Sequence, residues 1–533
     1  MAATALPRSE RSPDLSALAR FLAAASGASR VRLAGLDLLP GGAIQENWGL
    51  DAEFADGRLA GAQRLVLRTD APTGIPSSLG RIEEFAVLKA AFAAGVTVPE
   101  PLWACPDPSV LGKPFFVMRR VAGTAQGRHI TTDPTLEPDL PALAARLGRE
   151  LARIQTVRPP HPDLAFLPSI GAVQHIASFR AYLDRHPMPR PVLEWAARWL
   201  ETHLPEPAAP VLCHRDFRTG NYMLDGAELT GILDWEFAGW GDPDEDIGWF
   251  CCKGWRFARL DREAGGIALR GAFHEAYEAA SGRNLDPDRV RFWEVLANLR
   301  WAVIALQQSD RVLVAGARDL STAIIGRRAT ECELELLMLL DPGGGSRASC
   351  PHAEETPAVP MMMRDLPSGA ALLALGREML VNDLLPVVPP EHHRELRLVA
   401  TAIAIAEREA VAGDGPAHDI LCMLQQFYED GENALSALQG GEGGDPSRSG
   451  GEGEVGPGER SGIPHLTPTL SAPKGGEGDL GHLLRRLAAD LRKGAFERCG
   501  RRGRAARAIL WRLTILKLRE GNPQFLAENG FGE

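Results

Sequence analysis

Cysteine is sparse in this 533-residue sequence, and no two cysteines stand at a spacing typical of metal sites. There are eight, none in a Cys-x-x-Cys pair, and only Cys251 and Cys252 are close neighbours. Zinc sites and disulfide-stapled domains need cysteines, or cysteines and histidines, at short regular spacings. The pattern argues against both and favours reduced thiols, which predicts a cytoplasmic protein.

Long uncharged apolar runs are also missing. A membrane-spanning helix needs about 20 consecutive apolar residues, and no segment of the sequence approaches that length. Glu10 and Asp14 precede the first short apolar stretch, whereas an export signal begins with basic residues. We therefore expect no export signal, no membrane anchor and no membrane partner.

Basic residues are outnumbered by acidic ones. The sequence has 58 Lys and Arg against 69 Asp and Glu, a formal net charge of -11, which makes a nucleic-acid partner unlikely on electrostatic grounds. Arginine and lysine do crowd the C-terminal end. Such an end could contact an acidic partner or nucleic acid, but a solvated helix face is the favoured interpretation.

The N-terminal part has the pattern of a small antiparallel sheet. Short runs suited to strands are separated by Gly- and Asp-rich turns, and two stretches show helical spacing of apolar residues. Pro99 and Pro101 end the second helix. The predicted strands are 31–39, 48–54, 65–68 and 114–121, and the predicted helices are 15–26 and 79–95.

The remainder has mainly helical periodicity. The pattern predicts helices at 140–157, 176–184, 191–204, 260–281, 286–340, 369–385, 390–411, 420–438, 480–496 and 505–518. Gly- and Pro-rich segments interrupt them. We divide the chain into a sheet lobe (1–119), a helical lobe (120–345), a linker (346–360) and a helical accessory domain (361–533) with a disordered insert near 440–478.

The most informative pattern lies in the helical lobe, between two predicted strands. His214-Arg215-Asp216 is followed by Asn221, and the next strand ends at Asp234. A loop of this length lets a carboxylate face an acceptor hydroxyl while an amide and a second carboxylate hold magnesium beside ATP. The alternative is an aspartate that merely caps a turn. Because motif and context agree, we expect Asp216 to be the catalytic base and Asn221 and Asp234 to be the metal ligands.

With Asp234-Trp235-Glu236 and the run from Gly241 to Gly248, the loop resembles the aminoglycoside phosphotransferase-like family over about residues 30–340. The resemblance implies an α+β, protein-kinase-like bilobal fold, here followed by an all-α domain. It implies ATP and Mg2+ as cofactors and a hydroxyl on a small molecule as acceptor. His214 would support the loop, and Asp246 would satisfy exposed backbone N–H groups. Arg218 would neutralise charge on the transferred phosphoryl group, with a surface salt bridge as the alternative.

Two positions depart from the family pattern. Arg215 stands where many members have glycine, and Arg68 stands where the nucleotide-binding lysine is expected. A guanidinium can still bind two phosphate oxygens, so we expect Arg68 to bind the nucleotide. Its expected partner is Glu84, with Glu83 as the alternative.

A Gly-rich loop between the first two strands could cover the ATP phosphates, because glycine permits close backbone approach. Its candidate residues are Gly41, Gly42 and Asn47. A plain hairpin turn is the alternative.

Three functions fit the sequence. The leading one is a small-molecule kinase, for which the resemblance of Leu67-Arg68 and Phe217-Arg218 to a branch fused to acyl-CoA dehydrogenases suggests a hydroxyacyl-CoA substrate. The others are an aminoglycoside-type antibiotic kinase and a catalytically silent nucleotide-binding scaffold, the latter because the lysine is missing. Residues 361–533 resemble an uncharacterised helical domain found with such phosphotransferases. Its apolar positions predict packing within a bundle or against another chain.

Overall fold

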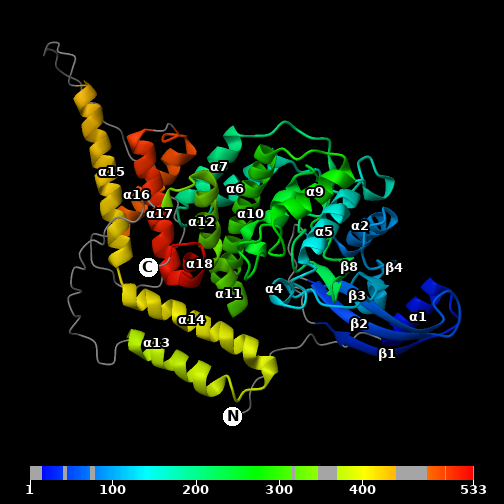
Figure 1. Cartoon of the computed structure of the whole chain (residues 1–533). Helices are drawn as coiled ribbons and strands as arrows, with labels where there is room; N and C mark the ends of the chain where they lie inside the picture. The colour runs from blue at the N-terminus through cyan, green and yellow to red at the C-terminus, as the bar shows by residue number, and fades with distance from the viewer. Residues whose placement is uncertain are drawn as a thin grey trace, which may run out of the picture. The chain divides into compact units, whose positions relative to one another are not determined.

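The computed structural model describes residues 15–39, 45–71, 78–314, 319–345, 369–439, 477–497 and 500–531 (Figure 1). These residues form two compact units. The first comprises Met1–Ser178 and Leu200–Trp301, and the second comprises Phe179–Trp199 and Ala302–Glu533. The predicted linker 346–360, most of the predicted insert near 440–478, and Gly41 and Gly42 lie outside the described residues.

The first unit begins with an antiparallel five-stranded sheet of order β1-β2-β3-β5-β4, drawn mainly in blue in Figure 1. Its strands are β1 (Val31–Leu38), β2 (Gln45–Phe54), β3 (Gly61–Asp70), β4 (Pro101–Cys105) and β5 (Phe115–Arg119). The helices of this lobe are α1 (Leu15–Ser26), α2 (Arg81–Ala93) and the short α3 (Pro108–Leu111).

The sheet is covered on both faces because successive strand residues point to opposite sides. Leu65 and Leu67 of β3 belong to one apolar cluster, which includes Leu18 and Leu22 of α1. Phe116, whose side chain points the other way from β5, belongs to a second cluster with residues of α2 and the helical lobe. The centre of β3 is therefore buried throughout, which fixes the position of Arg68 near its end.

The helical lobe of the first unit carries short strands between its helices. The helices are α4 (Gly127–Thr132), α5 (Leu140–Ile154), α8 (Glu245–Cys251), α9 (Arg270–Ser281) and the first part of α10 (Pro287–Leu313). The strands are β6 (Val211–Cys213), β7 (Tyr222–Asp225), β8 (Glu228–Ile232) and β9 (Gly239–Gly241); β6 pairs with β9, and β7 with β8. A β-carbon on Gly148 of α5 would lie 2.4 Å from the carbonyl oxygen of Phe273, so α5 and α9 pack with their backbones close together.

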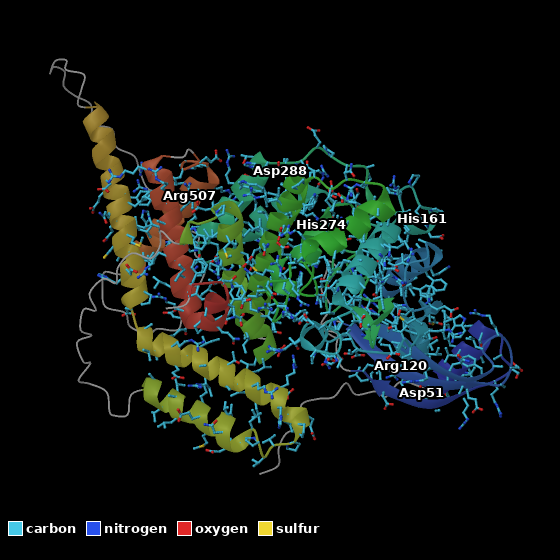
Figure 2. The ribbon with its side chains drawn as sticks, viewed as in Figure 1. Asp51, Arg120, His161, His274, Asp288 and Arg507 are labelled. Atoms are coloured by element: carbon cyan, nitrogen blue, oxygen red, sulfur yellow. The ribbon has the colours of Figure 1, made fainter. Side chains whose placement is uncertain are left out.

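The second unit is helical throughout the part that the structure describes. Its segments include α7 (Pro191–Thr202), α11 (Leu320–Arg327), α12 (Ala329–Leu340), α13 (Gly369–Glu378), α14 (His393–Ala412), α15 (Gly415–Gln439), α16 (Glu477–Arg492), α17 (Arg501–Gly521) and α18 (Pro523–Glu528). α17 packs against α12 and α15 and buries Ile509, Leu513 and Leu516. Arg507 of α17, labelled in Figure 2, makes an ion pair of 3.2 Å with Asp341.

The antiparallel sheet followed by a helix-rich remainder agrees with the predicted fold class, and two local expectations are wrong. Residues 260–269 do not belong to the helix predicted at 260–281, because Gly265 and Gly266 adopt positive φ angles of 57° and 76° and α9 begins only at Arg270. β4 was not expected, because Pro99 and Pro101 indicated only the end of a helix. Proline without its N–H is tolerated as the first residue of a strand, and Pro101 occupies that position.

Candidate active site

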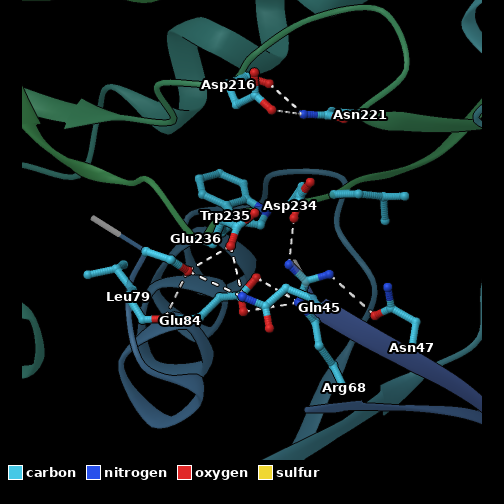
Figure 3. Close-up of polar contacts among 12 residues, drawn as sticks. Gln45, Asn47, Arg68, Leu79, Glu84, Asp216, Asn221, Asp234, Trp235 and Glu236 are labelled. Carbon is cyan, nitrogen blue, oxygen red and sulfur yellow. Dashed lines mark hydrogen bonds and ion pairs between the residues drawn. The ribbon is translucent and has the colours of Figure 1, made fainter. Parts of the chain in front are cut away.

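The loop between β6 and β7 holds Asp216 and Asn221 in direct contact (Figure 3). The Asn221 amide nitrogen donates to Oδ2 of Asp216 at 2.5 Å and to its carbonyl oxygen at 2.9 Å. Because the amide nitrogen of Asn221 donates to Asp216, the amide oxygen of Asn221 is the atom that can act as a metal ligand.

The other carboxylate oxygen of Asp216 has different partners. Oδ1 accepts from the indole N–H of Trp249 and from Nε of Arg218, each at 3.0 Å. The Asp216 side chain is 13% exposed, so an incoming hydroxyl can still reach it. Arg218 thus contacts the expected base. The same ion pair holds the guanidinium of Arg218 beside the Asp216 carboxylate.

His214 supports the loop from inside the protein. Its Nε2 lies 2.9 Å from the carbonyl oxygen of Leu233, and its Nδ1 accepts the N–H of Asp216 at 3.2 Å. These bonds assign the ring proton to Nε2. Burial lowers the pKa of His214, which favours the neutral ring that this pattern requires. The ring also packs on Trp235 at 4.5 Å between centroids.

Asp246 of α8 fixes the start of the same loop. Its two carboxylate oxygens accept the backbone N–H groups of His214 and Arg215, both at 2.7 Å. Arg215 has φ 62°, a left-handed conformation that costs little for glycine and more for arginine. The loop therefore needs an external anchor, and Asp246 supplies it.

Asp234 follows β8 and lies beside the loop. The N–H of Leu233 donates to the carbonyl oxygen of Asn221 at 2.8 Å, so Asp234 is adjacent to the Asn221 backbone. Its Oδ1 lies 2.5 Å from Nη2 of Arg68. Burial alone would raise the pKa of Asp234, but nearby basic side chains, chiefly Arg68, together outweigh it and lower the pKa, so the carboxylate is charged near neutral pH.

Arg68 joins the sheet lobe to this group of residues (Figure 3). Its Nε pairs with Glu84 at 3.0 Å and its Nη1 donates to the Asn47 side chain at 3.3 Å. Glu83 is not its partner, because that carboxylate instead accepts the N–H of Gly80 at the start of α2. Burial disfavours the charge on Arg68, but Glu84 and Asp234 outweigh it and raise its pKa.

The sequence prediction missed the contacts of Glu236, whose carboxylate lies near enough to Asp234 to feel its charge. Glu236 is 3% exposed and accepts from Gln45 of β2 at 2.8 Å and from the Ser78 hydroxyl at 2.6 Å (Figure 3). Glu236 belongs to the Asp234-Trp235-Glu236 motif, but the sequence pattern assigns no role to it. No local signal in the sequence could have matched it with Gln45 and Ser78, because both lie more than 150 residues away in the chain.

Comparison with known proteins decides the family of this domain. Residues 42–293 match the model of the phosphotransferase enzyme family. This segment belongs to that family. Mouse acyl-CoA dehydrogenase family member 10 is 31% identical over 203 residues, which are 36% of this chain and 18% of the mouse protein. The chicken acyl-CoA dehydrogenase family member 11 is 33% identical over 201 residues, 35% of this chain and 25% of that protein. The match thus spans a quarter or less of the length of these relatives.

A solved structure confirms the fold of the phosphotransferase domain. A protein from Ralstonia eutropha assigned as an aminoglycoside phosphotransferase superposes with a TM-score of 0.50 and 22% identity, covering 60% of this chain and 96% of the other. At that identity the likeness shows the kinase-like fold alone. Separately, none of the helices in the described ranges is long and apolar enough to cross a membrane.

The donor set of the phosphotransferase domain fits magnesium bound with a nucleotide. No cluster of three or more His, Cys, Asp or Glu able to hold a metal occurs among the described residues. Mg2+ seldom needs one, because it binds through one or two protein oxygen ligands together with phosphate oxygens and water. The Asp234 carboxylate, 29% exposed, and the Asn221 amide oxygen match that requirement.

Glu236 gives the phosphotransferase domain an unusual pH dependence. Burial and the charge of Asp234 raise its pKa to about 7, from an ordinary 4.5. The folded state therefore binds more protons than the unfolded state between these values, and stability is lost as pH rises through this window. We expect Glu236→Gln to match the wild type near pH 4.5 and to exceed it by about 3 kcal/mol near pH 8.

Thermal midpoints of both proteins, measured from pH 4.5 to pH 8.5, test this expectation. Glu100→Gln is the control of opposite sign. Burial opposes ionisation of Glu100, but the hydrogen bonds and charges of Arg119 and Arg58 together outweigh burial and lower its pKa. Most of the stability that the Glu100 charge contributes develops below pH 4.5, so from pH 4.5 upward the Glu100 variant should show only a small further loss relative to the wild type and no gain. A Glu236→Gln difference that stays constant over the whole range contradicts the assignment.

Proposed function

We propose that this chain transfers the γ-phosphate of Mg-ATP to a hydroxyl group of a small molecule. The observation that carries the proposal is the contact between Asp216 and Asn221, with Asp234 beside them. This arrangement offers one carboxylate to an acceptor and two oxygen ligands to a metal-bound nucleotide.

In the proposed reaction, Asp216 orients the acceptor hydroxyl and receives its proton. The hydroxyl oxygen forms a bond to the γ-phosphorus, the bond from that phosphorus to the β–γ bridging oxygen breaks, and ADP leaves with the electron pair. Asn221 and Asp234 would hold Mg2+, which neutralises phosphate charge when bound. Arg68 would turn from Asp234 to the phosphates, to which a guanidinium can donate two hydrogen bonds.

We further propose a hydroxylated acyl-CoA thioester as the acceptor. The support is that the curated relatives are named acyl-CoA dehydrogenase family members, although this chain spans only a small part of them. The test is an ADP-release assay on hydroxyhexanoyl-CoA isomers with the hydroxyl at carbons three to six. Kanamycin and choline serve as cationic acceptors, and hexanoyl-CoA as the control without a hydroxyl.

We expect transfer to at least one hydroxyacyl isomer, phosphorylation of the product by mass spectrometry, and no reaction above background with hexanoyl-CoA. Removing Mg2+ with excess EDTA should abolish transfer. Phosphorylation of kanamycin alone would replace the acyl thioester with an aminoglycoside as the acceptor.

A nucleotide-binding scaffold without catalysis is the second candidate. One observation favours it: Arg68, which replaces the expected lysine, is held by Asp234, one of the two proposed metal ligands. A scaffold binds Mg-ATP, measured by calorimetry, and shows no turnover with any acceptor of the panel. Turnover with any of them excludes it.

A further inference from the structure

Two tryptophans and two arginines gather on the side of Asp216 that does not face Asn221. Trp249 and Arg218 both donate to Oδ1 of Asp216 at 3.0 Å. The guanidinium of Arg218 lies over the ring of Trp255 at 4.6 Å, and that of Arg300, on α10, lies over Trp249 at 4.4 Å. The two indole rings are 5.1 Å apart. The guanidinium of Arg218 therefore contacts the proposed base directly, and Trp249 lies between the base and the guanidinium of Arg300.

Arg300 differs from buried arginines elsewhere in the first unit. Arg68, Arg81, Arg215 and Arg256 each make an ion pair with a carboxylate. Arg300 is half-buried, and among the residues that the structure describes its side chain makes no hydrogen bond or ion pair and one ring contact, with the face of Trp249. Burial lowers its pKa, and the charges of Glu245 and Asp216 oppose that shift without a direct contact.

The carboxylates near Arg300 are already engaged. Glu245 contacts Arg215 and His175, and Asp246 accepts two backbone N–H groups. Neither carboxylate forms an ion pair with Arg300. The cluster also contains an unused donor, because the indole nitrogen of Trp255 is buried and has no hydrogen-bond partner within the described ranges.

A half-buried guanidinium without an anionic partner is costly unless a ligand supplies one. We propose that Arg300, with Arg218, binds an anionic group of the acceptor, either a carboxylate or a phosphate. The flat guanidinium of Arg300 can give such a group two parallel hydrogen bonds, and the tryptophan beneath it fixes its plane. This inference rests on the proposed function and narrows it, because two cations beside the base repel cationic acceptors such as aminoglycosides.

The acceptors that test the inference share one hydroxyhexanoyl chain and differ in charge. The CoA thioester carries phosphates, and the pantetheine thioester is its counterpart without them. The free hydroxy acid carries a carboxylate, and its methyl ester is neutral. Comparing each pair separates a phosphate from a carboxylate as the anion. For every acceptor, both the kcat/KM of transfer and the dissociation constant with a non-hydrolysable Mg-ATP analogue are measured.

The informative variants are Arg300→Met, which removes the charge but keeps an unbranched apolar stem, and Arg300→Lys, which keeps the charge without the planar guanidinium. Arg128→Met is the matched control, since Arg128 is an exposed arginine of α4 in the same unit. Thermal midpoints show whether each variant is folded.

For the wild type we expect one anionic acceptor to exceed its neutral counterpart by about 10- to 100-fold in kcat/KM and affinity. In Arg300→Met, kcat/KM and affinity should fall for the anionic acceptor and stay unchanged for the neutral one, so that the preference is lost. Arg300→Lys should retain part of it, and Arg128→Met all of it.

Three outcomes separate the two claims. Transfer with equal efficiency to charged and neutral acceptors, unchanged in Arg300→Met, overturns the anion site and keeps the kinase. Anion-dependent binding without transfer, lost in Arg300→Met, supports the anion site and removes the kinase. An Arg300→Met variant that is folded and weakens the neutral acceptor equally overturns the anion site, because the residue then acts only through structure.

Discussion

Asp216→Asn should reduce transfer by about 10²- to 10⁴-fold while leaving Mg-ATP affinity within a few-fold of the wild type. Asparagine keeps the size of the side chain but cannot accept the proton of the attacking hydroxyl. The proposed metal ligands, Asn221 and Asp234, are untouched. The checks are single-turnover transfer with the best acceptor of the panel and calorimetry of Mg-ATP binding.

The same substitution should also cost some stability. Asp216 uses one oxygen to accept from Asn221 and the other to accept from Trp249 and Arg218. An asparagine offers one acceptor oxygen only, so one side of the site loses a hydrogen bond, at a cost of about 1–3 kcal/mol. Asp225→Asn, at an exposed aspartate beside the turn between β7 and β8, is the matched control and should change neither quantity. Wild-type turnover in Asp216→Asn would falsify the assigned role of the base.

The arrangement of Asp216, Asn221 and Asp234 could be anticipated because all its determinants are close in the chain. β7 and β8 form a hairpin in which Tyr222 pairs with Ile232. That pairing brings Asp234, which follows β8, back to the loop that precedes β7. Strand patterning, a turn at Asp225-Gly226 and the spacing of three polar residues were therefore sufficient.

Contacts that connect distant segments could not be anticipated in the same way. Gln45 and Glu236, or Trp249 and Arg300, are brought together by the packing of whole elements, and neither pair leaves a periodic trace in the sequence. The pairing of Arg68 with Glu84 is intermediate. The helix after β3 was predicted, and only its rotation, which selects Glu84 over Glu83, needed the structure.

Arg215 shows most clearly what sequence patterns leave out. The comparison with the family marked it as a departure from glycine, but not its function. Its guanidinium lies against β9, where a β-carbon on Gly239 would be 2.2 Å from Nη1. The absence of a side chain at Gly239 thus makes room for an arginine on the loop, a compensation between positions 24 residues apart in the chain.

From this environment we expect Arg215→Met to lower the free energy of unfolding of the first unit by about 3–5 kcal/mol. The Arg215 side chain is 4% exposed and pairs with Glu245, itself 3% exposed, at 3.2 Å. Its Nη2 also donates to the carbonyl oxygens of Ile170 and Trp240 at 3.0 and 2.9 Å. Methionine fills similar space but leaves Glu245 with His175 alone and two carbonyl groups without their donor.

Urea unfolding, with hydrogen exchange of residues 211–217 as the local measurement, tests this expectation. Arg32→Met is the control, because Arg32 and Glu53 form an ion pair whose side chains are 72% and 53% exposed. Such surface pairs contribute little to stability, because solvent and salt screen the two charges.

The double variant Arg215→Met with Glu245→Gln identifies the source of the loss. If an unpaired buried carboxylate causes it, the second substitution should recover part of the stability that the first removes. Strictly additive losses would instead assign the effect to the carbonyl contacts and to the packing against β9. Glycine at position 215 separates the remaining contribution: it relieves the positive φ angle of 62°, about 1 kcal/mol or more, and still lacks the ion pair. The free energy of unfolding of Arg215→Gly should therefore stay well below that of the wild type. The backbone conformation favours glycine, but glycine cannot replace the charge of the arginine.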